Sequence, residues 1–317
     1  MYLSSACGTT ASDESGGEKG WVFYKRIRHF PRLMLQNMQI FLQDRRVTES
    51  KLPLGQNSEY PNQYDPGVLF AIPRSEARSQ LADSALPFHG SDIWNAWELT
   101  WLGPSGVPVV ATAEIRVPVE SANLVESKSL KLYLNSYAMT RFDAASDVAV
   151  AMTKDLRNCT GGQVSVSIFL LADTLSNNIA ELPGTCIDSL TSSCDNYVVD
   201  SNLLLANNEN VVQEQLHTHL LRSLCPVTTQ PDIGSLGIHY QGPRIDAESL
   251  LRYVVSFREH NDFHEACVER MFVDILDKCG AEKLSLYARF QRRGGLDINP
   301  FRSNFEADPP DTRLWRQ

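Results

Sequence analysis

The chain has 317 residues, a formal net charge of −9 and 43% hydrophobic residues. That length suffices for one large domain or two of common size, each with an apolar core. The acidic charge disfavours a general nucleic-acid binder, and no apolar run reaches the ~18 residues that a membrane span requires. The seven cysteines lack the spacing of a secreted disulfide scaffold. We therefore expect a globular cytoplasmic protein that binds neither membranes nor nucleic acid.

Residues 1–50 differ in composition from the rest of the chain. They are first rich in Gly, Ser and Thr, and then basic with aromatic side chains. The polar start lacks the apolar core of a signal peptide. We expect a disordered or non-native extension; an amphipathic segment for a membrane surface or RNA is the alternative.

The spacing of apolar residues predicts the first elements of the globular part. Residues 97–101 alternate apolar and polar, a Gly/Pro turn follows, and residues 110–117 are β-rich, which indicates a hairpin. Residues 143–159 have helical spacing, with Asp143 or Ser146 as the expected N-cap, and "QVSVSIFLLA" then indicates a strand.

An internal repeat relates the two halves of the chain. At an ungapped offset of 120, residues 125–166 align on 245–286 with more identities than the roughly two or three that average residue usage would give. The identical pairs are Ser129/Ser249, Leu130/Leu250, Tyr133/Tyr253, Ser136/Ser256, Val148/Val268, Leu156/Leu276, Cys159/Cys279 and Ser165/Ser285. We predict two copies of a strand-rich module with a helical layer, residues 51–200 and 201–317.

The repeat also predicts where the reactive groups lie. Cys225 aligns with Ser105, Asp232 with Thr112, and the pair His264–Glu265 with two alanines, so only the second copy carries them. Because Ser105 falls in the turn of the first hairpin, the stretch from Cys225 to Gly234 is expected to connect two strands. The helical spacing of Leu216, Leu220 and Leu224 argues for a helix there instead.

Cys225 and Asp232 are the candidate reactive pair. A free cysteine is most often a small buried hydrophobe, and an aspartate before a glycine is often a turn residue. A reactive thiol must instead reach substrate and ionise, which suits the proline-interrupted loop "CPVTTQPDIGS". Together the two side chains offer a nucleophile and an acid for one substrate atom.

The stretch "FREHNDFHEACVERMF" holds His260, His264 and Glu265. The two histidines are four residues apart and would share a helix face, but the order H-E-x-x-H is absent, and we expect no metal. The pair His264–Glu265 suits recognition of a purine-like edge, because a carboxylate accepts paired N–H donors and an imidazole transfers protons near neutral pH. A solvated helix start is the alternative.

Two stretches suggest contact with phosphate. In "VESKSLKLYLNSY", Lys128 and Lys131 stand beside two serine hydroxyls, although a charged helix or strand face explains the pattern equally well. In "RFQRRGGLDINPFRS", Arg293 precedes a Gly pair that lets backbone N–H groups approach an anion. No G-x-G-x-x-G or G-x-x-x-x-G-K-[ST] motif occurs, so a nucleotide would not be held by a Rossmann or P-loop device.

Four stretches together resemble the NADPH-dependent 7-cyano-7-deazaguanine reductases, the nitrile reductases of queuosine biosynthesis, in their long two-module form. They are "ESKSLKLYLNS", "CPVTTQPDIGS", "YVVSFREHNDFHEACVERMF" and "YARFQRRGGLDINPFRS". The resemblance covers about residues 52–317. It implies an α+β fold of two tunnelling-fold (T-fold) modules, antiparallel sheets with helices on one side that assemble into a barrel, in a homodimer. A zinc-dependent GTP cyclohydrolase-like enzyme of that fold and a non-catalytic purine- or pterin-binding module are the alternatives.

The resemblance also implies roles for individual residues. Cys225 would form a covalent thioimide with the nitrile carbon, and Asp232 would protonate the nitrile nitrogen. NADPH would be the co-substrate and 7-cyano-7-deazaguanine the substrate, with no metal required. The implied substrate contacts are Val125, Glu126, Ser127, His264 and Glu265. The implied NADPH contacts are Ser127, Lys128, Arg293 and Gly294. Which glutamate dominates recognition of the base stays open.

Overall fold

The computed structural model describes residues 60–317 except 80, 82–84 and 172–178. These residues belong to one compact unit, Glu49–Gln317. The expected extension at residues 1–50 lies outside the described residues, and the predicted division at residue 200 stays a prediction.

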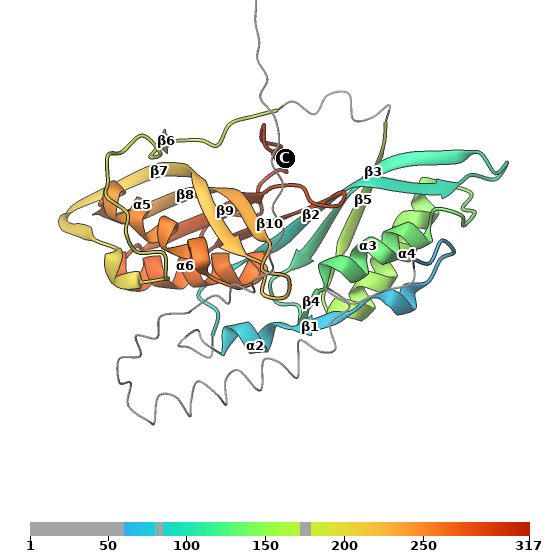
Figure 1. Cartoon of the computed structure of the whole chain (residues 1–317), viewed down its shortest axis with the longest axis horizontal. Coiled ribbons are helices and arrows are strands. Elements are labelled where there is room, and N and C mark those ends of the chain that lie inside the picture. The colour runs from blue at the N-terminus through green and yellow to red at the C-terminus, as the bar shows by residue number, and fades with distance from the viewer. Residues whose placement is uncertain (1–59, 80, 82–84, 172–178) are drawn as a thin grey trace, which may run out of the picture. The chain divides into compact units, whose positions relative to one another are not determined.

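An eight-stranded sheet forms the centre of this unit (Figure 1). Its order is β5-β3-β2-β10-β9-β8-β7-β6, and every pair is antiparallel except β6 with β7. The strands are β2 (His89–Leu102), β3 (Pro108–Pro118), β5 (Ser165–Leu170), β6 (Thr185–Cys186), β7 (Ala206–Leu224), β8 (Pro231–Ile245), β9 (Lys283–Phe290) and β10 (Leu296–Ser303). A separate two-stranded sheet pairs β1 (Ala71–Pro73) with β4 (Asn123–Val125).

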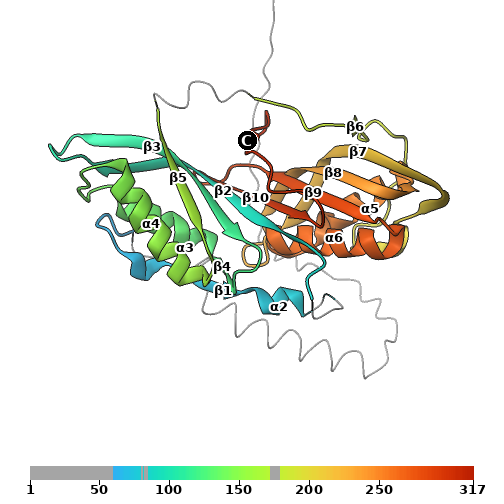
Figure 2. The same cartoon turned by 180° about the vertical axis from the view of Figure 1, so that it is seen from behind.

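Two helix pairs cover one face of the large sheet, one pair over each half (Figures 1 and 2). The first pair is α3 (Ser127–Ser136) and α4 (Ala145–Thr160), and the second is α5 (Ala247–Ser256) and α6 (His264–Cys279). A short helix α2 (Arg74–Arg78) and three 3₁₀ turns, Pro66–Val68, Ser201–Leu203 and Phe257–Glu259, complete the described elements. Each helix pair encloses its own apolar core against its strands. The expected α+β class with helices on one side is confirmed.

The sequence repeat has a structural counterpart. Apart from the short β4 before α3, which belongs to the small sheet, each half runs strand, strand, helix, helix, strand, as β2-β3-α3-α4-β5 and β7-β8-α5-α6-β9. In the large sheet β10 lies between β2 and β9. The repeated tyrosines perform the same task, because Tyr133 donates to Asp155 and Tyr253 donates to Asp274, both at 2.7 Å. Each bond ties the first helix of a pair to the second and satisfies a buried hydroxyl.

Several sequence expectations are confirmed and two are corrected. The hairpin is β2–β3, the helix over 143–159 is α4, and the strand after it is β5. The N-cap of α4 is Ala144 and not Asp143 or Ser146; the side chain of Asp147 accepts from the Ala144 amide instead. The helical interpretation of Leu216, Leu220 and Leu224 is wrong, because all three lie in β7, which is paired along its length with β8.

The large sheet is open within the described residues. Among the described strands, β5 pairs only with β3 and β6 only with β7, so the two edges do not meet and these strands form no closed barrel. None of the described helices is long and apolar enough to cross a membrane.

Candidate active site

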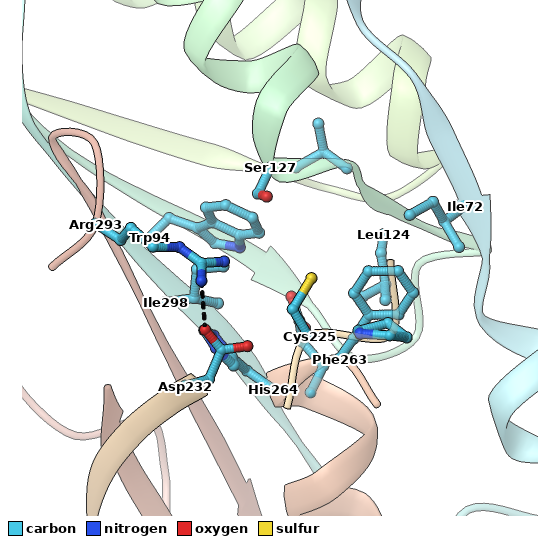
Figure 3. Close-up of a pocket in the computed structure, with 13 residues that line it drawn as sticks. Ile72, Trp94, Leu124, Ser127, Cys225, Asp232, Phe263, His264, Arg293 and Ile298 are labelled. Atoms are coloured by element: carbon cyan, nitrogen blue, oxygen red, sulfur yellow. Dashed lines mark ion pairs between the residues drawn. The ribbon is translucent and has the colours of Figure 1, made fainter. Parts of the chain in front are cut away.

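A pocket lies where the two halves of the sequence meet (Figure 3). Side chains from β1, β2, β4 and the start of α3 form one side, and the β7–β8 loop and the start of α6 form the other. Of the residues singled out from the sequence, those that line it are Val125, Ser127, Cys225, Asp232, His264, Glu265 and Arg293. Glu126, Lys128 and Gly294 are not among its lining residues.

Cys225 is the first residue after β7, and its loop holds it at the pocket. Its amide donates to the Gln230 carbonyl and its carbonyl accepts from the Thr229 amide, both at 2.9 Å, which closes a tight loop between β7 and β8. The residue is 4% exposed and its thiol points into the pocket (Figure 3). The expected connection between two strands is confirmed for residues 225–230, whereas residues 231–234, with Asp232 among them, already belong to β8.

The other buried thiols are poor nucleophiles. Cys267 and Cys279 lie in the core of the second half, and burial raises the pKa of Cys279 to about 11 and that of Cys267 well above its usual value. Burial likewise raises the pKa of Cys159 to about 11. A thiolate is the reactive form of cysteine, so these three residues are unsuited to attack on a substrate.

Asp232 sits between Arg293 and His264. Its Oδ1 lies 3.1 Å from Arg293 Nη1, and its Oδ2 lies 3.2 Å from His264 Nε2 (Figure 3 marks the arginine pair). The imidazole of His264 stacks on Phe290 with ring centroids 3.9 Å apart, which fixes the plane of the ring. Both ring nitrogens of His264 are buried without a hydrogen bond of good geometry, although Nε2 is within ion-pair distance of Asp232. Such nitrogens are suited to meet a polar ligand.

Glu265 is the second residue of α6 and faces the pocket. It is 3% exposed, and no side chain among the residues that the structure describes hydrogen-bonds its carboxyl. Burial, followed by the negative charge of Asp92, raises its pKa to about 8. The expectation that His260 and His264 share a helix face is wrong, because His260 ends the preceding 3₁₀ turn and α6 begins only at His264.

A buried network of charges lies behind Glu265. Asp92 accepts from Arg74 at 2.5 Å and from Arg302 at 2.7 Å, and Arg302 also bonds Glu269 at 2.9 Å. Burial alone would raise the pKa values of Asp92 and Glu269, but the positive charge of Arg302, with that of Arg74, holds both below their usual range. The network therefore keeps fixed charges next to a carboxyl that is largely protonated at neutral pH.

Glu126 has a structural task in this arrangement. Its carboxylate is the N-cap of α3 and accepts from the amides of Lys128 and Ser129, both at 2.8 Å. Asp246 caps α5 in the same way by accepting from the Ser249 amide, so the cap belongs to the repeated module and not to the pocket alone. Lys128 lies half-buried on the same first turn.

Two basic side chains, Lys131 and Arg293, lie beside the pocket at the turn between β9 and β10. Gly294 has φ +61°, and a Cβ there would lie 3.1 Å from the Cε atom of Lys131. Burial, together with the neighbouring charge of Arg293, lowers the pKa of Lys131. Lys131 was one of the lysines that suggested phosphate contact, and its position beside Arg293 could not be read from the sequence.

Most of the apolar lining of the pocket was not predictable from the sequence. The lining residues that no sequence pattern indicated are Ile72, Trp94, Leu124, Phe263 and Ile298. These residues look like ordinary core positions. The pairing of β1 with β4 and of β2 with β10 brings four of them together, and Phe263 is the N-cap residue of α6.

The fold and pocket define a class: an α+β protein of two repeated halves whose junction holds a thiol, a paired carboxylate and a buried glutamate. Residues 60–168 match the family "Nitrile reductase, 7-cyano-7-deazaguanine-reductase N-term", and residues 231–309 match "QueF-like protein". An NADPH-dependent 7-cyano-7-deazaguanine reductase of Chromobacterium violaceum is 49% identical over 274 residues, which cover 86% of this chain and 98% of that protein. The chain therefore belongs to the 7-cyano-7-deazaguanine reductase family.

Proposed function

We propose that this protein reduces the nitrile of 7-cyano-7-deazaguanine to the aminomethyl group with two NADPH, a step of queuosine biosynthesis. The observation that carries the proposal is the position of the Cys225 thiol in one pocket with Asp232, His264 and Glu265. The name of the Chromobacterium relative supports the substrate and the reductant. The family match favours this reaction over GTP hydrolysis and over a non-catalytic binding module.

Cys225 is the proposed nucleophile. Its sulfur adds to the nitrile carbon, one C–N π bond breaks, and the nitrogen takes a proton, which gives a thioimide. Asp232 is the proposed donor of that proton, because its carboxyl faces the same pocket and its partners Arg293 and His264 fix its orientation. After the first reduction the C–S bond breaks, the thiol leaves, and the resulting imine is reduced once more.

Glu265 and His264 are the proposed contacts for the deazaguanine. A carboxylate accepts two N–H donors from a guanine-like edge, and Glu265 is the pocket glutamate without an internal hydrogen-bonding side chain. Val125 and Ser127 line the opposite side. Glu126 stays a proposed neighbour of the substrate, but its oxygens are used by the cap of α3. We therefore assign the main contact with the base to Glu265.

The residues beside the pocket fit a phosphate-bearing cofactor. Arg293 and Lys131 are cationic, and Gly294 leaves the turn open because it has no Cβ. NADPH, when bound, supplies one hydride for each of the two reductions. We propose that Ser127, Lys128, Arg293 and Gly294 hold it, with Lys131 as an additional cation.

We further propose that the two halves are T-fold modules and that the protein works as a homodimer in the cytoplasm, where thiols stay reduced. The open sheet supports this, because among the described strands its outer strand β5 is paired on one side only, and a second copy could continue the sheet there toward a barrel. Light scattering on the purified full chain tests the dimer. A monomer at working concentration would contradict it.

The decisive experiment mixes the protein with 7-cyano-7-deazaguanine in the absence of NADPH. We expect the intact mass to rise by the mass of one substrate, with the adduct on the peptide that carries Cys225. Cys225→Ala should form no adduct and consume no NADPH, whereas the matched control Cys194→Ser should behave as the wild type. An adduct on another residue, or normal turnover by Cys225→Ala, would rule out the covalent route.

A further inference from the structure

A cluster of potential metal ligands lies away from the pocket, at the β6 edge of the sheet. The Sγ of Cys186 and one ring nitrogen each of His217 and His219 all lie within 4.8 Å of one another. None of the three residues lines the pocket with Cys225. The proposed nitrile chemistry makes no use of them.

Strand pairing explains why these side chains converge. Cys186 on β6 is the register partner of His217 on β7, and His219 is two residues further along β7. Residues two apart on a strand point to the same face, and register partners on neighbouring strands are adjacent. Leu216 turns to the helix-covered core, so His217 and His219 face the other side of the sheet.

Hydrogen bonds hold both imidazoles in place. His217 Nδ1 lies 3.1 Å from the Pro183 carbonyl and His219 Nδ1 lies 2.8 Å from the Ser235 hydroxyl. A carbonyl can only accept, so Nδ1 of His217 must carry the proton, which leaves Nε2 with a free lone pair. Metal-binding histidines are typically oriented by a bond of this kind from the other ring nitrogen.

We propose that Cys186, His217 and His219 bind a zinc-type divalent ion. One thiolate and two imidazoles are ligands that zinc prefers, and a solvent molecule can take the fourth position because Cys186 is exposed. Such an ion would fasten the segment that carries Cys186 to β7, where Ile187 already donates to the His217 carbonyl at 3.0 Å. The proposed role is structural and separate from nitrile reduction.

The first test measures zinc binding with Zn²⁺ alone as the probe. The full-length Cys225→Ala protein, reduced and freed of metal, competes with a chromophoric chelator, so that the pocket thiol cannot contribute. We expect one ion per chain. Loss of a residue that orients a metal ligand typically weakens metal binding about 10–100-fold, so adding Ser235→Ala should weaken zinc binding within that range. Adding Cys186→Ser or His219→Ala removes a ligand itself and should weaken zinc binding by more. Adding Cys194→Ser is the matched control and should change nothing.

The second test reports thiolate ligation directly. Co²⁺ in place of zinc should give a sulfur-to-metal charge-transfer absorption that Cys194→Ser keeps and Cys186→Ser loses. Zinc should also raise the melting temperature of the wild type and of Cys194→Ser, but not of Cys186→Ser. Because Cys186 is exposed, its replacement should leave the metal-free melting temperature unchanged. No bound ion at micromolar Zn²⁺, or binding that Cys186→Ser leaves intact, would overturn the proposal.

Discussion

The carboxylate of Asp232 lies 3.1 Å from the guanidinium of Arg293. Asp232 is the second residue of β8, and Arg293 belongs to the turn between β9 and β10. The contact thus joins the proposed proton donor to the proposed cofactor contact. Arg293 also bonds the Gln230 side chain in the loop of Cys225 at 3.3 Å. One guanidinium therefore orders the acid and the thiol loop together.

Arg293→Lys should weaken NADPH binding more than it slows chemistry. Lysine keeps the charge but loses the planar fork that contacts two groups at once. Loss of one charge-assisted bond corresponds to about 1.5–3 kcal/mol, or a rise in the KM for NADPH of about 10- to 100-fold. Steady-state rates of NADPH consumption, followed by its absorbance, give this KM. Arg292→Lys is the control, because Arg292 lies over the Trp97 ring outside the pocket, and an equal effect there would refute the assignment.

Asp232→Asn should slow formation of the thioimide. Asparagine keeps the shape of the side chain but cannot donate the proton as an acid, and general acid catalysis typically contributes about 10²–10⁴-fold. Mass spectrometry of samples quenched at successive times, in the absence of NADPH, measures the rate at which the Cys225 adduct forms. Substrate affinity should change little by comparison. A normal rate of adduct formation would mean that the proton comes from another group.

Much of the fold was predictable from the sequence, for a physical reason. The patterns that indicate strands and helices are local in the sequence. The identities at an offset of 120 residues then predicted that the second half repeats the elements of the first. The position of β10 was not predictable, because its pairing with β2 depends on residues about 200 positions apart. That same pairing places Trp94 beside Ile298 in the pocket.

The candidate site was predictable only in part. The types and spacing of Cys225 and Asp232 marked them as a pair, and Pro226 marked a loop. Sequence could not distinguish the two glutamates, because a carboxylate that caps a helix and one that faces a pocket have the same local pattern. The hydrogen bonds of Glu126 and the burial of Glu265 separate them.

Glu265 should couple substrate binding to release of a proton. Its pKa is raised to about 8 by burial, so it is mostly protonated in the free protein at neutral pH. Accepting two N–H donors requires the carboxylate, so affinity should rise with pH up to about 8 and then level off. Titration calorimetry in buffers of different ionisation enthalpy measures the number of protons released when the substrate binds. Glu265→Gln should abolish the release, whereas Glu126→Gln should keep it; release that persists in Glu265→Gln would identify another group.

The same raised pKa predicts how stability depends on pH. The unfolded chain ionises Glu265 near its ordinary value of 4.5 and the folded chain only near 8, so between these values the unfolded state holds fewer protons. The contribution of Glu265 to the free energy of unfolding is fully present below pH 4.5 and falls as pH rises to 8. Glu265→Gln should therefore have a higher free energy of unfolding than the wild type near pH 8, which urea unfolding measures. Equal stability of the two proteins there would contradict this.

Arg74 should be a positioning residue for Glu265. It bonds Asp92 at 2.5 Å, and its charge lowers the pKa of Glu265 against the effect of burial. Arg74→Met leaves buried carboxylates short of a partner, which should lower the free energy of unfolding by about 3–5 kcal/mol. It should also move the pH midpoint of substrate binding upward, because Glu265 then ionises less readily.

The pH midpoint distinguishes positioning from a merely structural role. Arg74→Lys keeps a positive charge and should restore the midpoint, even where it restores stability only in part. Arg78→Met is the matched control, because Arg78 bonds Glu269 at 2.8 Å from a more exposed position and is not among the charges that shift Glu265. It should lower stability by less and leave the midpoint unchanged. If Arg74→Met binds substrate with the wild-type pH profile, Arg74 supports only the fold.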